Sequence, residues 1–120
     1  MKPTGVVANI NVTDIDEAKR FYSDYLGLSD VAFDLGWVVN LQSADGRASV
    51  QLVGGDATSP ADSAISVHVG DQIEEAYEDA QQRGYEVVYP LTTESWGVRR
   101  FFVRAPDGTV VNIVSHVDEA

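Results

Sequence analysis

The sequence predicts an α+β fold of two βαβββ modules in one chain, whose strands form a curved mixed sheet with the helices on its outer face. A strand-like stretch that runs into a helix-like stretch, residues 6–28, recurs 57 residues later at residues 63–85. The ends of the two copies also match, because Asp45-Gly46 precedes SVQLV and Asp107-Gly108 precedes VVNIV. At 120 residues the chain has the size of one domain. We therefore expect a single domain, 1–120, with module one at about 5–54, a linker at about 55–62 and module two at about 63–116.

The first strand of each copy shows the two-residue period of a half-buried strand. In the first copy the apolar positions are Val6, Ala8, Ile10 and Val12, and the alternate face carries Val7, Asn9 and Asn11. In the second copy the apolar positions are Ile65, Val67 and Val69, and the alternate face carries Ala64, Ser66 and His68. One face of each strand should therefore pack on helices, and the other face is unusually polar.

A helix follows each of these strands. Asp14 with Glu17, and Asp71 with Glu74, fit the capping box, in which the aspartate accepts backbone N–H bonds and the glutamate reaches back. The expected buried stripes are Ile15, Ala18, Tyr22 and Tyr25 in the first helix and Ile73, Ala76, Tyr77 and Ala80 in the second. Gly27 and Gly84 supply left-handed helix ends.

Three further strands are expected after each helix. They lie at about residues 29–33, 37–42 and 48–53 in module one and at about 86–89, 99–104 and 109–116 in module two. Ala44-Asp45-Gly46 and Pro106-Asp107-Gly108 provide the hairpin turns. Each module then has one face covered by its helix and one open face, and two modules side by side would leave a curved groove that suits a small molecule.

Composition narrows the classes of function. There is no cysteine, which excludes disulfides, thiolate nucleophiles and cysteine-bound metals. The net charge of −11 argues against nucleic acid as a partner and favours a cationic ligand. The alternative explanation of this charge is that acidic side chains on the surface keep the protein soluble. No apolar stretch has membrane-spanning length and no secretory signal is evident, so we expect a cytoplasmic protein without a membrane partner.

The order of elements and two motifs resemble the vicinal oxygen chelate superfamily, which includes glyoxalase I, extradiol dioxygenases, and fosfomycin and bleomycin resistance proteins. The motifs are NVTDIDEAKRFYSDYLGL in the first helix region and SWGVRRFFVRAPDGTVVNIV in the late hairpin. The second motif is similar to the closing segment of bleomycin-resistance-type members. The resemblance covers nearly the whole chain.

The resemblance also indicates where a metal would bind. Metal-dependent members carry His, Glu or Gln on the first and last strand of each module, and those positions fall on Val7, Gln51, Ala64 and Asn112. Valine and alanine cannot coordinate a metal, and two neutral amides hold one poorly without a charged partner. A shift by one residue would bring Ala8 and Ile65, which are no better. We therefore expect no metal and no cofactor.

The leading hypothesis is a metal-independent binding protein, a homodimer that sequesters an antibiotic or other natural product, as the bleomycin resistance proteins that it resembles do. The ligand would be cationic or aromatic. The candidate aromatic contacts are Phe33, Trp37, Trp96 and Phe102, and the candidate polar contacts are Asn9, Asn11, Gln51, Ser66, His68, Asn112 and Arg100. For the aromatic residues, a place in the core is the simpler alternative.

Three residues have a second interpretation. His68 could act as a general base in a metal-independent isomerase or lyase, but no carboxylate partner is evident nearby in the sequence, so a hydrogen-bonded structural histidine is the simpler expectation. Arg99 and Arg100 could bind a carboxylate or phosphate. Adjacent strand residues point to opposite faces, and an exposed arginine paired with an acid is the default for each.

A third hypothesis is a metal enzyme with relocated ligands, namely His68, His116 and a carboxylate. For His116, close to the C-terminus, a surface position is the simpler alternative.

Overall fold

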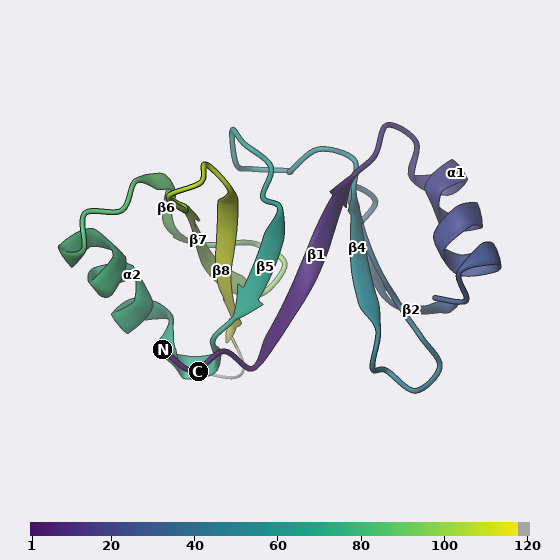
Figure 1. Cartoon of the computed structure of the whole chain (residues 1–120), viewed down its shortest axis with the longest axis horizontal. Coiled ribbons are helices and arrows are strands. Elements are labelled where there is room, and N and C mark those ends of the chain that lie inside the picture. Colours follow the sequence, from purple (N-terminus) through teal and green to yellow (C-terminus); the bar gives the residue numbers. More distant parts are fainter. Residues whose placement is uncertain (118–120) are drawn as a thin grey trace. The chain divides into compact units, whose positions relative to one another are not determined.

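The computed structural model describes residues 1–117 and confirms the α+β class with two βαβββ modules (Figure 1). The chain forms two compact units, residues 7–62 and residues 1–6 together with the chain from Ser63 on. We treat each unit by itself. No helix among residues 1–117 is long and apolar enough to span a membrane.

The unit of residues 7–62 contains the first module. Its elements are β1 (Gly5–Asn11), α1 (Ile15–Lys19), the π-helix η1 (Arg20–Tyr25), β2 (Asp30–Asp34), β3 (Val38–Gln42) and β4 (Ser49–Val53). The strands lie in the order β2-β3-β4-β1, with β1 parallel to β4 and the other neighbours antiparallel. Its core consists of buried Val39, Leu41 and Leu52, against which Ile10, Val12, Ile15, Ala18, Tyr22, Leu28 and Val50 pack.

The second unit repeats this plan. Its elements are β5 (Ile65–His68), the 3₁₀ turn η2 (Gly70–Gln72), α2 (Ile73–Gln82), β6 (Val87–Thr93), β7 (Val98–Arg104) and β8 (Val110–His116). The strands lie in the order β6-β7-β8-β5, with β5 parallel to β8. The helix α2 lies against one face of this sheet (Figure 1), where the core is made of Val69, Ile73, Ala76, Ala80, Phe101 and Ile113.

The first six residues join the second unit through backbone contacts. The backbone N–H of Thr4 donates to the carbonyl of His68 at 2.8 Å, and the backbone N–H of Lys2 donates to Gln72 Oε1 at 2.8 Å. Val6, expected on the buried face of the first strand, is largely exposed, as is Ala8. The apolar face of β1 is therefore buried only from Ile10 on.

The two helices begin differently, and one capping prediction is wrong. Asp14 has extended backbone angles (φ −137°, ψ 105°) and accepts the backbone N–H of Glu17 at 3.1 Å, as predicted. Asp71 lies inside the turn η2, and α2 starts at Ile73 without a side-chain cap. The reason is Gly70, whose φ of +59° leads into a 3₁₀ turn instead of an extended cap residue.

The predicted buried stripe of the first helix also fails at one position. Ile15, Ala18 and Tyr22 pack on the core, but Tyr25 is 76% exposed. Residues 20–25 form a π-helix, whose i→i+5 bonds hold more residues per turn than an α-helix and rotate Tyr25 off the stripe. The stripe of α2 is confirmed, and Gly27 and Gly84 have the expected positive φ values of 82° and 77°.

The strand predictions are confirmed within a residue or two except at β6. This strand extends to Thr93 and contains Pro90, with irregular pairing on both sides of Tyr89. Because β6 is the last strand in the order of its unit, a proline without an N–H is tolerated there. The Asp-Gly turns are confirmed, since Gly46 and Gly108 have φ values of 72° and 93°.

Candidate functional site

Two rows of side chains cross the sheet of the second unit on the face away from α2. Strand alternation places Phe101 and Ile113 on the α2 face, so their neighbours in sequence point the other way. The pairing of strands defines the first row as Tyr89, Phe102, Asn112 and Ser66. It defines the second row as Thr92, Arg100, Val114 and His68. Five of the candidate site residues therefore share one face of one module.

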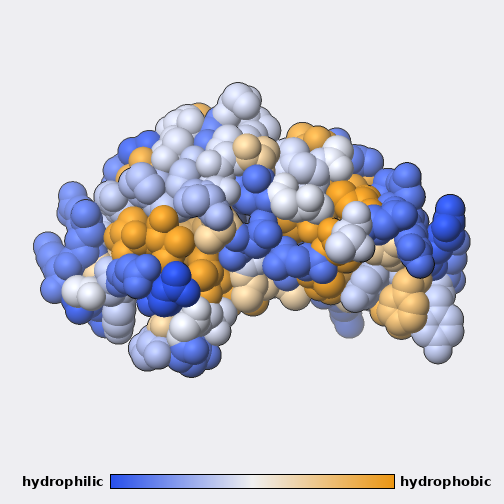
Figure 2. Space-filling model, turned by 90° about the horizontal axis from the view of Figure 1, so that it is seen from above, coloured by the Kyte–Doolittle hydropathy of each residue, from blue (hydrophilic) through white to orange (hydrophobic). Residues whose placement is uncertain are grey.

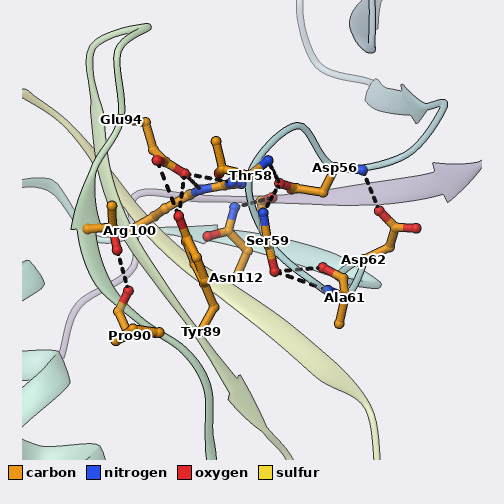
Figure 3. A network of polar contacts seen from close by, with 12 residues as sticks. Asp56, Thr58, Ser59, Ala61, Asp62, Tyr89, Pro90, Glu94, Arg100 and Asn112 are labelled. Atoms are coloured by element: carbon orange, nitrogen blue, oxygen red, sulfur yellow. Dashed lines mark hydrogen bonds and ion pairs between the residues drawn. The ribbon is translucent and has the colours of Figure 1, made fainter.

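Arg100 is the charged centre of this face. Its side chain is buried, with 4% of the residue exposed, and both Nε and Nη2 lie 2.8 Å from Glu94 Oε2. The Tyr89 hydroxyl lies 3.2 Å from the same carboxylate oxygen. Figure 3 shows these three side chains pointing toward one another. The default expectation of an exposed Arg100 is therefore wrong, since its guanidinium forms a buried ion pair.

Aromatic rings surround the guanidinium of Arg100. Its Cζ atom lies 5.5 Å from the ring centroid of Tyr89, 5.1 Å from that of Trp96 and 4.9 Å from that of Phe102. These distances are within the range of cation–π attraction. Phe102 has no exposed surface, whereas Trp96 is half-buried. Of the two predicted aromatic contacts in this module, only Trp96 presents surface to solvent.

A tight turn brings Glu94 and Trp96 to Arg100. The backbone N–H of Gly97 donates to the carbonyl of Glu94, and Gly97 has a φ of +90°. The backbone N–H of Glu94 donates in turn to the carbonyl of Val98 at 2.7 Å. This hairpin between β6 and β7 folds the acidic residue back beside the strand that carries Arg100.

Sequence reasoning missed Glu94 and Tyr89 as partners of Arg100. A usable signal exists, because an arginine that shares its strand face with Val98 and Phe102 needs a counter-charge, and Glu94 is the nearest acid across the turn. Arg99 behaves as expected for an alternating strand. It points to the helix side, where its Nε bonds Glu74 Oε1 at 2.6 Å and lowers the pKa of that carboxyl.

Amide side chains occupy the equivalent row in the first unit. Gln51 Nε2 donates to Asn9 Oδ1 at 2.6 Å, and Asn40 Nδ2 donates to Gln51 Oε1 at 3.4 Å. Ser49 Oγ donates to Asn40 Oδ1 at 3.2 Å, so these side chains form a continuous ladder. Asn40 is buried and was not among the predicted residues, whereas Asn11 lies exposed at the end of β1.

The corresponding row of the second unit is less complete. Asn112 Nδ2 donates to Ser66 Oγ at 3.0 Å. The Asn112 side-chain oxygen is buried, and no donor among the described residues bonds it. Asn112 and Ser66 are 7% and 2% exposed. Among the buried side-chain atoms of residues 1–117, this oxygen is an acceptor that the site leaves without a hydrogen bond.

The residues at the expected metal positions do not fit a divalent ion. In register, Gln51 faces Asn9 and Asn112 faces Ser66, so the two amides bond their neighbours and not a common point within either module. None of these side chains, nor Val7 or Ala64, supplies a carboxylate or an imidazole. Within residues 1–117 no three His, Cys, Asp or Glu side chains come together as a metal-binding group. The relocated set of His68, His116 and a carboxylate is not assembled there.

The two histidines of the chain lie against each other in the second unit. The rings of His68 and His116 stack with centroids 5.6 Å apart and planes 12° from parallel. His68 is half-buried in the row of Arg100, which agrees with its predicted face. His116, expected on the surface, is also half-buried.

Trp37 and Phe33 belong to the first unit. Trp37 is half-buried and lines a pocket of about 470 Å³, together with Thr13, Asp14, Ile15, Asp16, Lys19, Asp34, Gly36 and Gly54. The backbone N–H of Gly36 and the Lys19 ammonium lower the pKa of Asp34. Phe33 lies on β2 opposite Asn40 and is 38% exposed.

Two modules of the same βαβββ order, each with a row of polar side chains on the face away from its helix, define the class to which this protein belongs. The model of the glyoxalase/bleomycin resistance protein/dioxygenase superfamily matches residues 5–113, and the chain belongs to this superfamily. No curated protein sequence gave a significant match.

Solved structures of the same fold include three that differ widely in name. A superfamily member from Vibrio splendidus has 22% identity and a TM-score of 0.68, covering 92% of this chain and 97% of that one. Methylmalonyl-CoA epimerase from Mycobacterium tuberculosis has 21% identity and a TM-score of 0.68, covering 95% and 89%. A Legionella pneumophila protein named NAD-dependent benzaldehyde dehydrogenase has 13% identity and a TM-score of 0.73, covering 93% and 99%. At these identities the likeness shows the fold alone.

Proposed function

We propose that this protein binds a small organic molecule without metal chemistry, as a member of the branch of its superfamily that lacks metal ligands. The proposal depends on the residue set Val7, Gln51, Ala64 and Asn112, which occupies the positions where, according to the resemblance, metal-dependent members carry their ligands. The amides of Gln51 and Asn112 donate hydrogen bonds to the neighbouring side chains of Asn9 and Ser66. A protein that only binds its ligand needs no metal ion at these positions.

The chemistry of the second unit supports an aromatic ligand. Trp96 is half-buried, and its ring centroid lies 5.1 Å from Cζ of the Arg100 guanidinium. The ring is therefore a rigid surface for stacking. The net charge of −11 adds a long-range attraction for cations. A planar cationic natural product, such as an antibiotic of the bleomycin type, combines both properties.

Tryptophan fluorescence tests this proposal, because the chain has two tryptophans, one in each unit. Titration with bleomycin and a panel of planar cations should quench emission in a saturable way. Trp37→Phe leaves only Trp96 as reporter and should keep the response, whereas Trp96→Phe should lose most of it. Flat titrations of the wild type across the panel would remove the antibiotic version of the proposal.

A metal-independent isomerase or lyase is the second candidate, favoured by the place of His68 on the same face as Arg100 and Asn112. A half-buried imidazole there could remove a proton beside a carbonyl group and return it to the same carbon. A relative of the same fold is an epimerase of methylmalonyl-CoA. Incubation of that thioester in D₂O with chelator present should then give deuterium uptake at the epimerised carbon, abolished by His68→Ala and retained in His116→Ala. Equal uptake in both variants excludes His68 as the base.

We also infer that the protein acts as a homodimer, as expected from the resemblance. Light scattering on a size-exclusion column should give twice the mass of one chain at micromolar concentration. A single-chain mass across the concentration range contradicts the dimer without affecting the binding proposal.

A further inference from the structure

We propose that an exposed aromatic patch on η1 is the surface through which two copies of this chain associate. The patch consists of Phe21, Tyr25 and Leu26, which are 52%, 76% and 49% exposed, and we call it the η1 patch. This inference rests on the homodimer of the proposed function and names its interface.

The rings of the η1 patch are held in place from below. Tyr22 packs on the core of the first module. The ring of Phe21 lies edge to face against Tyr22, with centroids 5.1 Å apart, and the ring of Tyr25 lies against Phe21 at 5.3 Å. Side chains that are already ordered lose little conformational entropy when a partner covers them. The exposed rings therefore have a fixed arrangement before any partner binds.

The π-helix accounts for the exposure of Tyr25. In a regular α-helix this residue would continue the buried stripe that Ile15, Ala18 and Tyr22 form. The wider turn of residues 20–25 rotates Tyr25 off that stripe and places it against Phe21. Short π-helical turns are rare and occur frequently at functional sites. The local geometry thus exposes a tyrosine that the sequence pattern would bury.

The area of the η1 patch fits the centre of a dimer interface. From their exposed fractions, the three side chains present on the order of 300 Å² of surface in each copy. A stable interface buries about 800 Å² on each partner, with an apolar centre inside a polar rim. The patch therefore has the size of such a centre, and the polar surface around it would supply the rim.

The charge around the η1 patch favours a second copy of this chain as the partner. Residues 19–26 contain two basic side chains and one acidic side chain, whereas the whole chain contains 8 basic and 19 acidic ones. Two copies of so acidic a protein repel each other over most of their surface, and the repulsion is smallest where the local charge is not negative. Arg20, exposed at the edge of the patch, adds an attraction for carboxylates of the second copy.

The outer strand of the sheet is a less favourable route to a dimer. All five residues of β2 are exposed, and β2 is the last strand in the order of its unit. Antiparallel pairing of two β2 strands centred on Ala32 would place Asp30 of one copy opposite Asp34 of the other. Like charges in opposed positions destabilise a strand pair, and charged side chains protect sheet edges from such pairing. The helix side of this unit is therefore the better surface for association.

Cross-linking tests which surface lies at the twofold axis. Because the chain has no cysteine, a short bismaleimide can join two copies only through an introduced cysteine. Leu26→Cys keeps both rings of the patch and should be cross-linked about a hundredfold faster than Ala32→Cys, the exposed control on β2, since the dimer holds its two thiols at a high effective concentration. Faster linkage of Ala32→Cys would show that the sheet edges pair, and it would overturn the proposal.

Sedimentation equilibrium measures the contribution of the rings. Tyr25→Ser should raise the dissociation constant of the dimer by about a hundredfold, because each dimer loses two aromatic contacts at its centre. Tyr85→Ser, which removes a 45% exposed tyrosine of the other unit, is the matched control and should leave the constant unchanged. Circular dichroism checks that both variants keep the fold.

The outcomes separate the interface from the dimer and from ligand binding. If Tyr25→Ser associates as tightly as the wild type, the η1 patch is not the interface, although the dimer stands. If the wild type itself sediments as a single chain at every concentration, both the dimer and this interface are rejected, while the tryptophan titrations still decide the binding function.

Discussion

Asn112 carries a buried side-chain oxygen that no donor of the described residues bonds. An unsatisfied buried acceptor costs about 1–3 kcal/mol, which a hydrogen bond elsewhere does not recover. Gln51, at the matching position of the first module, accepts from Asn40 and donates to Asn9. The side-chain amide of Gln51 therefore has a hydrogen-bond donor for its oxygen, whereas the amide oxygen of Asn112 has none among the described residues. Substitution of the two residues should change the stability of the protein by different amounts.

We expect Asn112→Leu to change the free energy of unfolding by less than about 1 kcal/mol, because loss of the bond to Ser66 is offset by removal of the unsatisfied oxygen. Gln51→Met should lower it by about 2 kcal/mol, since two bonds are lost and the buried Asn40 amide is left without its acceptor. Urea denaturation followed by circular dichroism measures both. Equal destabilisation by the two substitutions would mean that the Asn112 oxygen has a partner in solution.

At the scale of elements, the repeated Asp-x-x-Glu motif correctly predicts the N-cap of the first helix and wrongly predicts that of the second. A capping aspartate needs extended backbone angles, which Asp14 has and which the 3₁₀ turn denies to Asp71. Its companion Glu74 pairs with Arg99 instead. The motif is present in the local sequence, but the backbone conformation at Gly70 prevents it from forming a cap. The start of the second helix therefore could not be predicted from the motif alone.

The same limit applies to the site. Strand alternation correctly placed Ser66 and His68 on one face, because the period of a strand is fixed by its geometry. The partner of Arg100 was missed, since the Glu94 contact depends on how the turn at Gly97 folds back. The alternation of residues along a strand predicts to which face of the sheet a side chain points. Which residue of a neighbouring turn it contacts depends on the geometry of that turn.

The matched aspartates give a prediction for the helix starts. Asp14→Ala should lower the free energy of unfolding by about 1 kcal/mol, because it removes the acceptor for the Glu17 N–H. Asp71→Ala should change it by no more than a few tenths of a kcal/mol, since Asp71 caps nothing. Thermal or urea unfolding of the two variants in one buffer provides the comparison. A loss at Asp71 as large as that at Asp14 would show that this aspartate caps the second helix after all.

The hairpin turns should make stability depend on pH. The backbone N–H of Thr109 lowers the pKa of Asp107, and the Ser43 hydroxyl and the backbone N–H of Arg47 lower that of Asp45. A carboxyl with a lower pKa in the folded state stabilises the protein above its unfolded pKa of about 4, and this contribution is lost as the pH falls through the folded value.

Asp107→Asn should therefore be less stable than the wild type at pH 7, with a difference that shrinks as the pH falls below about 4. Asp24→Asn, an exposed position in η1, serves as control and should differ from the wild type equally at both pH values. Urea midpoints at pH 7 and pH 3 suffice. A difference for Asp107→Asn that stays constant with pH would show that its charge has no part in the turn.

For the whole molecule the dominant electrostatic fact is the excess of 19 acidic over 8 basic residues. Hydrophilic side chains cover much of the face seen in Figure 2, interrupted by apolar patches. Within residues 1–117, five of the eight basic residues form exposed or partly exposed pairs of limited value, namely Lys19–Asp34, Arg47–Asp45, Arg83–Asp79, Arg99–Glu74 and Arg104–Glu86. Because 19 acidic side chains share 8 basic ones, the acidic side chains cannot all be neutralised, and their mutual repulsion should exceed the sum of these attractions.

Screening should therefore stabilise the protein. At 0.01 M salt the Debye length is about 30 Å, which spans a small domain, and at 0.15 M it is about 8 Å. Raising NaCl between these concentrations should raise the melting temperature at pH 7, because repulsion among the carboxylates is screened more than the short ion pairs are. Glu75→Gln with Glu78→Gln, two exposed positions on α2, should raise the melting temperature at low salt and reduce its salt dependence. A melting temperature that falls with NaCl would mean that the ion pairs, and not the net charge, dominate the electrostatic energy of the fold.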